Sequence, residues 1–322
     1  MASDTSAARV AATGGPAKGG TRLVRITRSF GHEKYLYAMT AVGVVLVFLF
    51  SYLPMYGVLL AFKRYDFTAG ILGSPWVGFH NFELFFRNPF FWRLIRNTVL
   101  LGFLSIVWGF WPPILLALLL NEVRSPGYKR AVQTITYLPH FIAVVVIIGM
   151  LKELLAYDGV VNRLVAALGG EQVSYFAKPG WFRTIYIGSG VWQGIGFSTI
   201  IYLAALSGID PELYESSIVE GAGRLQMARY ITLPHLLPYV MVLLILSTVG
   251  IINVGFEKVF LMYSPATYET ADVIQTFVYR LALEGGQFAF GTAVGLFNSV
   301  VSLIFMVAVN LLARRVAGHS LW

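Results

Sequence analysis

The sequence predicts an all-α polytopic membrane protein with six transmembrane helices. Of its 322 residues, 57% are apolar and only 12% are charged, whereas soluble domains carry about 25% charged residues. The chain also contains six runs of more than 20 residues without Asp, Glu, Lys or Arg, and about 20 apolar residues let a helix cross a bilayer. Lipid offers no partners to backbone N–H and C=O groups, so each span must be helical. The predicted spans are about 35–62, 97–121, 131–151, 184–209, 235–256 and 289–313.

The two ends of the chain are predicted to be tails outside the membrane, at residues 1–34 and 314–322. The first is basic and lacks an apolar period through its Gly-rich part, which is typical of a disordered segment. The charge-free run of 28 residues that follows is longer than the apolar region of a cleaved signal sequence, so we expect it to remain as an anchor. Gly20 stands where a phosphate-binding loop needs its lysine, so the tail holds no nucleotide-binding loop.

Orientation follows from the basic residues between the spans. Six spans place both termini on one side, and that side carries 13 Lys and Arg residues against 11 on the other. The positive-inside rule therefore favours cytoplasmic termini by a small margin.

The predicted spans contain no carboxylate, lysine or arginine, and the chain has no cysteine. Proton-coupled carriers and voltage sensors depend on charged groups within the membrane, so neither is predicted. No metal site is predicted either. His140 lies beside Pro139, where we expect it to hydrogen-bond a carbonyl that the proline leaves free. The paired carboxylates, HExxH or GxSxG that a membrane-embedded enzyme would use are absent from this sequence. Such an enzyme, and a carrier or channel that acts alone, are the alternatives to a transporter whose energy comes from outside the chain.

The loop at residues 208–234 predicts a helix–turn–helix on the membrane face. Asp210 followed by Pro211 is a strong helix start, because the aspartate caps the first turn and the proline presets the backbone. Gly221 and Gly223 are expected to permit a sharp turn, and a second short helix is expected to end near Pro234. Small side chains and exposed carboxylates on such a loop suit a protein partner that offers arginines.

This loop resembles the EAA loop of bacterial ABC importer permeases, in which a glutamate and two small residues precede a glycine and then Ile-x-Leu-Pro. Two serines replace the usual alanines, and Glu220 replaces the usual aspartate. Asn88–Trp92, Tyr128–Arg130 and Tyr137–Pro139 are similar to the polysaccharide-type branch of this family, and the resemblance covers residues 35–313. Within that branch the pattern is similar to the first permease subunit of an alginate-oligosaccharide importer. The resemblance assigns coupling to an ATPase to Glu215, Ser216, Ser217, Gly221, Ala222, Gly223, Ile231, Leu233 and Pro234.

The resemblance implies the type I ABC importer permease fold in a bacterial inner membrane, with both termini cytoplasmic. It implies a second homologous permease, two ATP-binding subunits, a solute-binding protein, and a saccharide substrate in a multi-pass membrane complex. The chain itself is expected to carry no catalytic site and no cofactor, since ATP and Mg²⁺ bind to the partner ATPases.

Residues that could contact a saccharide are polar or aromatic and lie deep in the last three spans, because sugars are held by aromatic faces, amides and hydroxyls. An acidic, alginate-like oligosaccharide is the first prediction for the substrate and a neutral one is the alternative. The acidic prediction rests on the resemblance and on two clusters, Lys63–Arg64 and Arg93 with Arg96, which could steer a polyanion. The candidate contact residues are Trp192, Gln193, Asn253, Phe256 and Asn298.

Overall fold

The computed structural model describes residues 34–251 and 254–317, and the chain divides into two units, 1–56 and 57–322. The predicted tails lie mostly outside the described residues, as does Asn253. In the first unit, α2 (Lys34–Val47) continues into a π-helical turn, η1 (Phe48–Tyr52). A 3-10 segment, η2 (Leu53–Phe62), follows at Pro54, whose ring cannot supply a backbone N–H to a regular α-helix.

The second unit consists of helices joined by loops, and no β-sheet occurs in residues 57–251 and 254–317. Its α-helices are α3 (Gly70–Gly73), α4 (His80–Phe86), α5 (Phe91–Glu122), α6 (Pro126–Tyr137), α7 (Val144–Leu154), α8 (Val160–Ala167), α9 (Pro179–Leu206), α10 (Pro211–Val219), α11 (Arg224–Met227), α12 (Leu233–Thr248), α13 (Phe256–Met262), α14 (Tyr268–Ala271), α15 (Ile274–Val278) and α16 (Phe288–Ala317).

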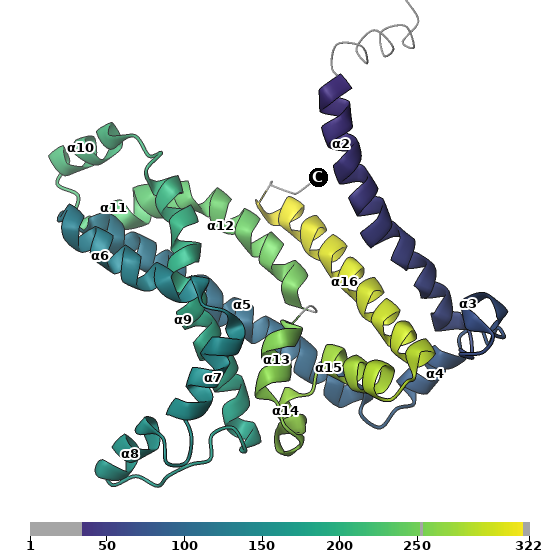
Figure 1. The fold of residues 1–322 in the computed structure, drawn as a ribbon. Helices are drawn as coiled ribbons and strands as arrows, with labels where there is room; N and C mark the ends of the chain where they lie inside the picture. The colour runs from purple at the N-terminus through teal and green to yellow at the C-terminus, as the bar shows by residue number, and fades with distance from the viewer. Residues whose placement is uncertain (1–33, 252–253, 318–322) are drawn as a thin grey trace, which may run out of the picture. The chain divides into compact units, whose positions relative to one another are not determined.

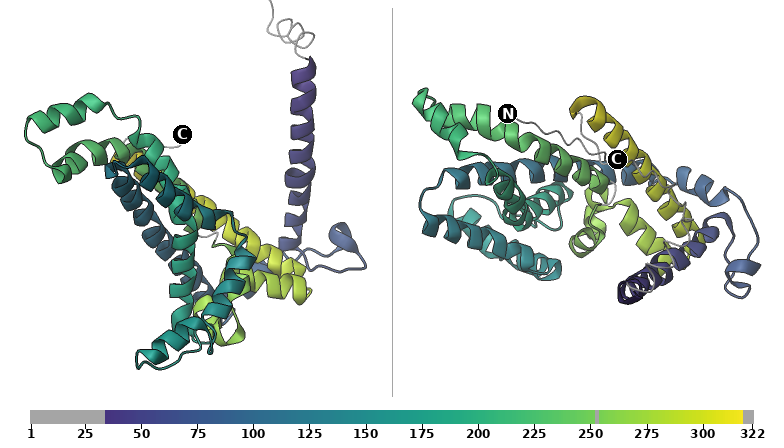
Figure 2. Two further views of the ribbon diagram at one scale, coloured as in Figure 1. Left: turned by 60° about the vertical axis from the view of Figure 1, so that its left-hand side comes forward. Right: turned by 90° about the horizontal axis from the view of Figure 1, so that it is seen from above.

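Long apolar helices form the frame of this unit. Across the described residues five helices are long and apolar enough to cross a membrane, or six if one bent pair counts as a span. α5 packs along α9 (Figure 1), and both views in Figure 2 keep them together. These helices expose large apolar side chains, such as Trp111 at 60% and Ile304 at 60%. A water-soluble monomer rarely exposes so much apolar surface, whereas lipid or a membrane partner covers it at no cost.

The third predicted span, 131–151, is not one straight helix. α6 and the following turn meet α7 at an angle of 100°. The break lies after Pro139, where Ile142 and Ala143 adopt extended backbone angles. At the break the amide of Gln193 donates to the Ile142 carbonyl at 3.1 Å. The His140 ring stacks on the Phe197 ring, with centroids 4.0 Å apart. Because His140 makes no hydrogen bond in the described part of the chain, the expectation that it bonds a carbonyl freed by Pro139 was wrong.

The fifth predicted span begins earlier than expected. Arg224–Thr248 is one apolar helical stretch of 25 residues, so no short helix ends near Pro234. A π-helical turn at Ala228–Thr232 connects α11 to α12. The wider π-helical turn lets the helix continue through Pro234. Proline has no backbone N–H to donate to a carbonyl of the preceding turn.

Candidate functional site

The start of α10 is capped as the sequence predicts. The Asp210 carboxylate accepts a hydrogen bond from the backbone N–H of Glu212 at 3.0 Å, and Pro211 occupies the first helical position. Glu212 in this first turn also complements the helix dipole. The cap therefore defines the residue at which α10 begins after the short connection from α9.

The end of α10 depends on Gly221. Its φ of +83° lies in the left-handed region, which side chains other than glycine rarely adopt. Two hydrogen bonds close the helix, from the Gly221 N–H to the Ile218 carbonyl at 3.0 Å and from the Ala222 N–H to the Ser217 carbonyl at 2.9 Å. This pair is the Schellman motif. Gly223 has an ordinary φ of −76° and caps α11. Of these two glycines, only Gly221 has a backbone conformation that favours glycine.

A hollow of about 460 Å³ lies between α10 and the segment formed by the end of α11 and the π-helical turn after it, and ten residues of this loop line it. Ser216, Ser217 and Gly221 form part of its wall, so small groups leave the floor of the hollow accessible. Apolar side chains flank it, with Val219 at 89% and Leu225 at 83% exposure. Glu220 lines the hollow, whereas Glu215 is exposed on α10 and is not part of the lining. The surface offers an apolar rim, open backbone and a carboxylate, which suits docking by another protein.

The loop is rigidly joined to the long helices. Tyr214 and Ile231 pack against a buried cluster that includes Tyr202 of α9 and Leu236 of α12. The Tyr214 hydroxyl also shares a hydrogen bond with the Thr232 hydroxyl at 3.1 Å. Packed side chains therefore connect α10 to α9 and α12. Leu233 and Pro234 are exposed at the start of α12.

The predicted saccharide contacts do not form one cluster. Phe256 and Asn298 line the same open cavity of about 530 Å³ between α15 and α16. The Asn298 carboxamide oxygen is buried and has no hydrogen-bond partner in the described part of the chain. Trp192 lies on α9 with 48% exposure, and Gln193 is engaged at the break between α6 and α7.

One residue of each predicted steering cluster, Lys63 and Arg93, is engaged in internal contacts, whereas Arg64 and Arg96 are exposed. Lys63 is only 3% exposed, and its ammonium donates to the carbonyls of Ile71 and Leu72 at 2.9 and 2.8 Å. The prediction that Lys63 presents a surface charge was therefore wrong. A sequence cannot show that a nearby turn brings two free carbonyls to a lysine.

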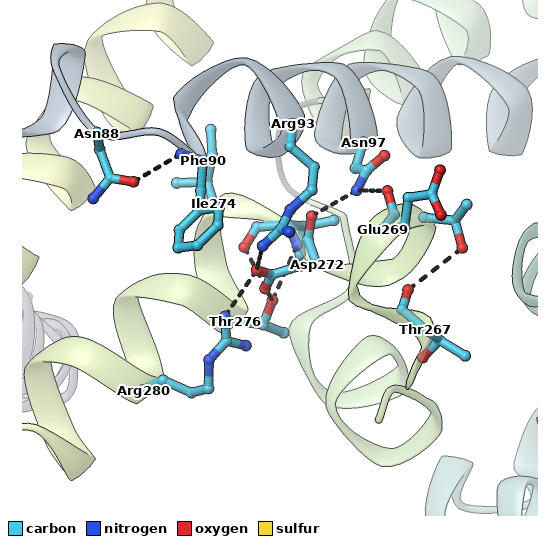
Figure 3. Close-up of polar contacts among 12 residues, drawn as sticks. Asn88, Phe90, Arg93, Asn97, Thr267, Glu269, Asp272, Ile274, Thr276 and Arg280 are labelled. Carbon is cyan, nitrogen blue, oxygen red and sulfur yellow. Dashed lines mark hydrogen bonds and ion pairs between the residues drawn. The ribbon is translucent and has the colours of Figure 1, made fainter. Parts of the chain in front are cut away.

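Arg93 belongs to a polar network around Asp272 (Figure 3). Asp272 is fully buried and pairs with Arg93 at 3.2 Å and with Arg280 at 2.8 Å. Asn97 of α5 donates to the Glu269 and Asp272 carbonyls at 3.0 and 3.1 Å. Burial opposes the charge of Arg280, but the hydrogen bond and charge of Asp272 outweigh it and raise the Arg280 pKa. The network ties the segment between α13 and α15 to the start of α5.

Long apolar helices joined by a capped, exposed loop define a membrane component that couples to a separate protein. Residues 113–318 match the family described as "Binding-protein-dependent transport system inner membrane component". The chain belongs to this family, which confirms the resemblance drawn from the loop. It is a multi-pass inner-membrane permease of an ABC importer, and it works with a second permease, ATPase subunits and a binding protein. An enzyme or a carrier acting alone is set aside.

Similar proteins cover nearly the whole chain. Protein LplB of Bacillus subtilis (strain 168) is 42% identical over 291 residues, covering 90% of this chain and 92% of that protein. The polygalacturonan/rhamnogalacturonan transport system permease protein YteP of the same organism is 42% identical over 291 residues, covering 90% and 91%.

Two crystal structures match the fold. A chain from a bacterial ABC transporter involved in the import of the acidic polysaccharide alginate is 44% identical, with a TM-score of 0.85, and the match covers 91% of this chain and 99% of that one. A chain from the alginate ABC transporter in complex with an alginate pentasaccharide-bound periplasmic protein is 43% identical. Its TM-score is 0.85, and the match covers 92% of this chain and 100% of that one.

Proposed function

We propose that this permease, with a second permease, imports an acidic oligosaccharide delivered by a solute-binding protein. The observation that carries the substrate class is similarity at 42–44% identity to a polygalacturonan/rhamnogalacturonan permease and to alginate transporter chains. Alginate and polygalacturonan are polymers of uronic acids, so a carboxylate on each sugar is their shared chemistry. A neutral oligosaccharide is the second candidate, because more distant relatives include lactose and trehalose/maltose permeases at 26% and 30% identity.

Coupling to ATP is proposed to pass through α10. ATP binding by the partner ATPases must stabilise one global state of the permease pair over the other. In this proposal the hollow beside α10 receives the ATPase, the exposed Glu215 pairs with a basic residue of the ATPase outside the hollow, and Gly221 holds the turn. The remaining members, Ser216, Ser217, Ala222, Gly223, Ile231, Leu233 and Pro234, shape the hollow or its junction with α12.

This assignment places the loop, and with it both termini, in the cytoplasm. It also leaves the chemistry of ATP to the partners, so we propose that this chain has no ATPase site and binds neither ATP nor Mg²⁺. The family membership supports a transport role, and Phe256 and Asn298 stay as candidate saccharide contacts, together with Trp192, Gln193 and Asn253.

Reconstitution into proteoliposomes with the partner subunits and binding protein tests the proposal. ATP-dependent uptake of a labelled uronate tetramer is expected, and unlabelled uronate oligomers should block it and stimulate ATPase activity. Both effects should weaken as salt rises, since exposed charges are screened. If neutral oligomers of equal length stimulate ATPase activity better, and without salt dependence, the substrate is a neutral oligosaccharide and the acidic assignment is refuted. ATP-independent uptake by this chain alone would refute the coupled mechanism.

A further inference from the structure

A polar cavity lies between α5, α9 and α13, and neither Phe256 nor Asn298 lines it. Its volume is about 280 Å³. It shares Ser105, Gly109, Tyr186 and Ser198 with a neighbouring cavity of about 370 Å³ that extends towards α12. Together these cavities offer hydroxyl groups and an aromatic residue over the space that small-molecule sites commonly occupy.

Lys258 of α13 reaches into the wall of the smaller cavity. Its ammonium donates to the Tyr186 carbonyl at 2.8 Å and lies 4.8 Å from the centre of the Tyr186 ring. Gly190 leaves room for it, because a Cβ there would lie 3.1 Å from the Lys258 nitrogen. The helix that carries Lys258 is fixed, since Val259 and Met262 are part of a buried cluster with Tyr186. The lysine is therefore held in place at the cavity.

The ammonium has no compensating carboxylate in the described part of the chain, where the ion pairs involve other residues. Of the elements packed on α13, α15 has no charged residue, α9 carries Tyr186 and Arg183, and α7 carries Lys152 and Glu153, which are both exposed. Arg183 donates to Asn97, and Glu257 of α13 itself is exposed. Burial lowers the pKa of Lys258 to about 8. An ammonium has three donors and only one is engaged here, so a partly buried cation beside a cavity favours an anionic ligand.

We propose that the Lys258 ammonium binds a carboxylate of the transported oligosaccharide in this cavity, while Ser105 and Ser198 meet its hydroxyl groups. The inference rests on the proposed function, because it takes a uronate as substrate. In this inference one side chain, Lys258, selects the acidic sugar inside the permease. The charged residues at the ends of the helices are not needed for this selection.

The test uses the reconstituted importer with saturating binding protein and a labelled mannuronate tetramer. Lys258→Met and Lys258→Gln should lower ATP-dependent uptake by about ten- to a hundredfold, the worth of hydrogen bonds to a charged group. Lys258→Arg keeps the charge and should stay within about threefold of the wild type. Lys152→Met removes an exposed lysine from α7 and is the matched control, with uptake unchanged. Size-exclusion chromatography of each purified complex verifies assembly.

The outcomes separate this inference from the proposed function. Uptake by Lys258→Met equal to that by Lys152→Met overturns the inference and leaves the acidic substrate standing. The inference also fails if uptake by Lys258→Arg falls as far as uptake by Lys258→Met, because the shape of lysine rather than its charge would then matter. Equal losses in Lys258→Gln and Lys258→Met support it, since glutamine can still donate to the Tyr186 carbonyl. Wild-type importer that transports neutral tetramers and no mannuronate refutes the proposed substrate before any variant is compared.

Discussion

Replacing Gly221 with valine should uncouple the permease from its ATPase. The φ of +83° at this position costs an L-residue about 1–2 kcal/mol, and a β-branched one more. If the backbone relaxes instead, the two closing hydrogen bonds of α10 are lost at about 1 kcal/mol each. Either way the cost is about 2 kcal/mol. α10 has only nine residues, which is too short to be stable alone, so we expect its last turn to unwind.

The assay is ATP-dependent uptake in proteoliposomes, measured beside ATPase activity. Because about 1.4 kcal/mol is tenfold in an equilibrium, Gly221→Val should reduce uptake at least about tenfold while the protein still inserts into the membrane. Gly221→Asn is the conservative control, since asparagine tolerates the left-handed region. Gly208→Ala is the positional control, because Gly208 is not among the positive-φ glycines and the nearest atom to a Cβ there lies 3.5 Å away. Normal uptake by Gly221→Val would refute the role given to this turn.

Three further predictions concern buried polar groups. Asp272→Asn should lower the melting temperature of the purified importer by several degrees, because both paired arginines lose their buried counter-charge; an unchanged melting curve would contradict it. Gln193→Leu should destabilise the complex by about 1–3 kcal/mol, the cost of the unsatisfied Ile142 carbonyl, and stability equal to wild type would show that another group satisfies that carbonyl. Burial lowers the pKa of Lys258 to about 8, so its charge is present below pH 8 and lost above it. The uptake advantage of wild type over Lys258→Met should therefore shrink from pH 7 to pH 9, and a constant ratio would argue against a charged contact.

The sequence determined the local features of this protein. Charge-free runs predicted the long helices because the membrane excludes charged and unpaired polar groups whatever the fold. Asp210, Pro211 and Gly221 predicted the boundaries of α10 because caps and left-handed turns depend on the residue at one position. The same short motif led to the family, which the comparisons confirm. Local rules sufficed for these features, since neighbours in sequence are the partners.

Only the tertiary structure decided which polar groups are engaged and which face a cavity. Lys63 and Lys258 both come just after charge-free runs in the sequence and have the same chemistry. One binds two carbonyls of a nearby turn, and the other lines a polar cavity. The break after Pro139 likewise depends on Gln193, about 50 residues away. Partners of this kind come together through packing, and no periodicity records them. The sequence therefore determined where the helices and the coupling turn lie, and the packing of those helices decided where a charge is free to meet a ligand.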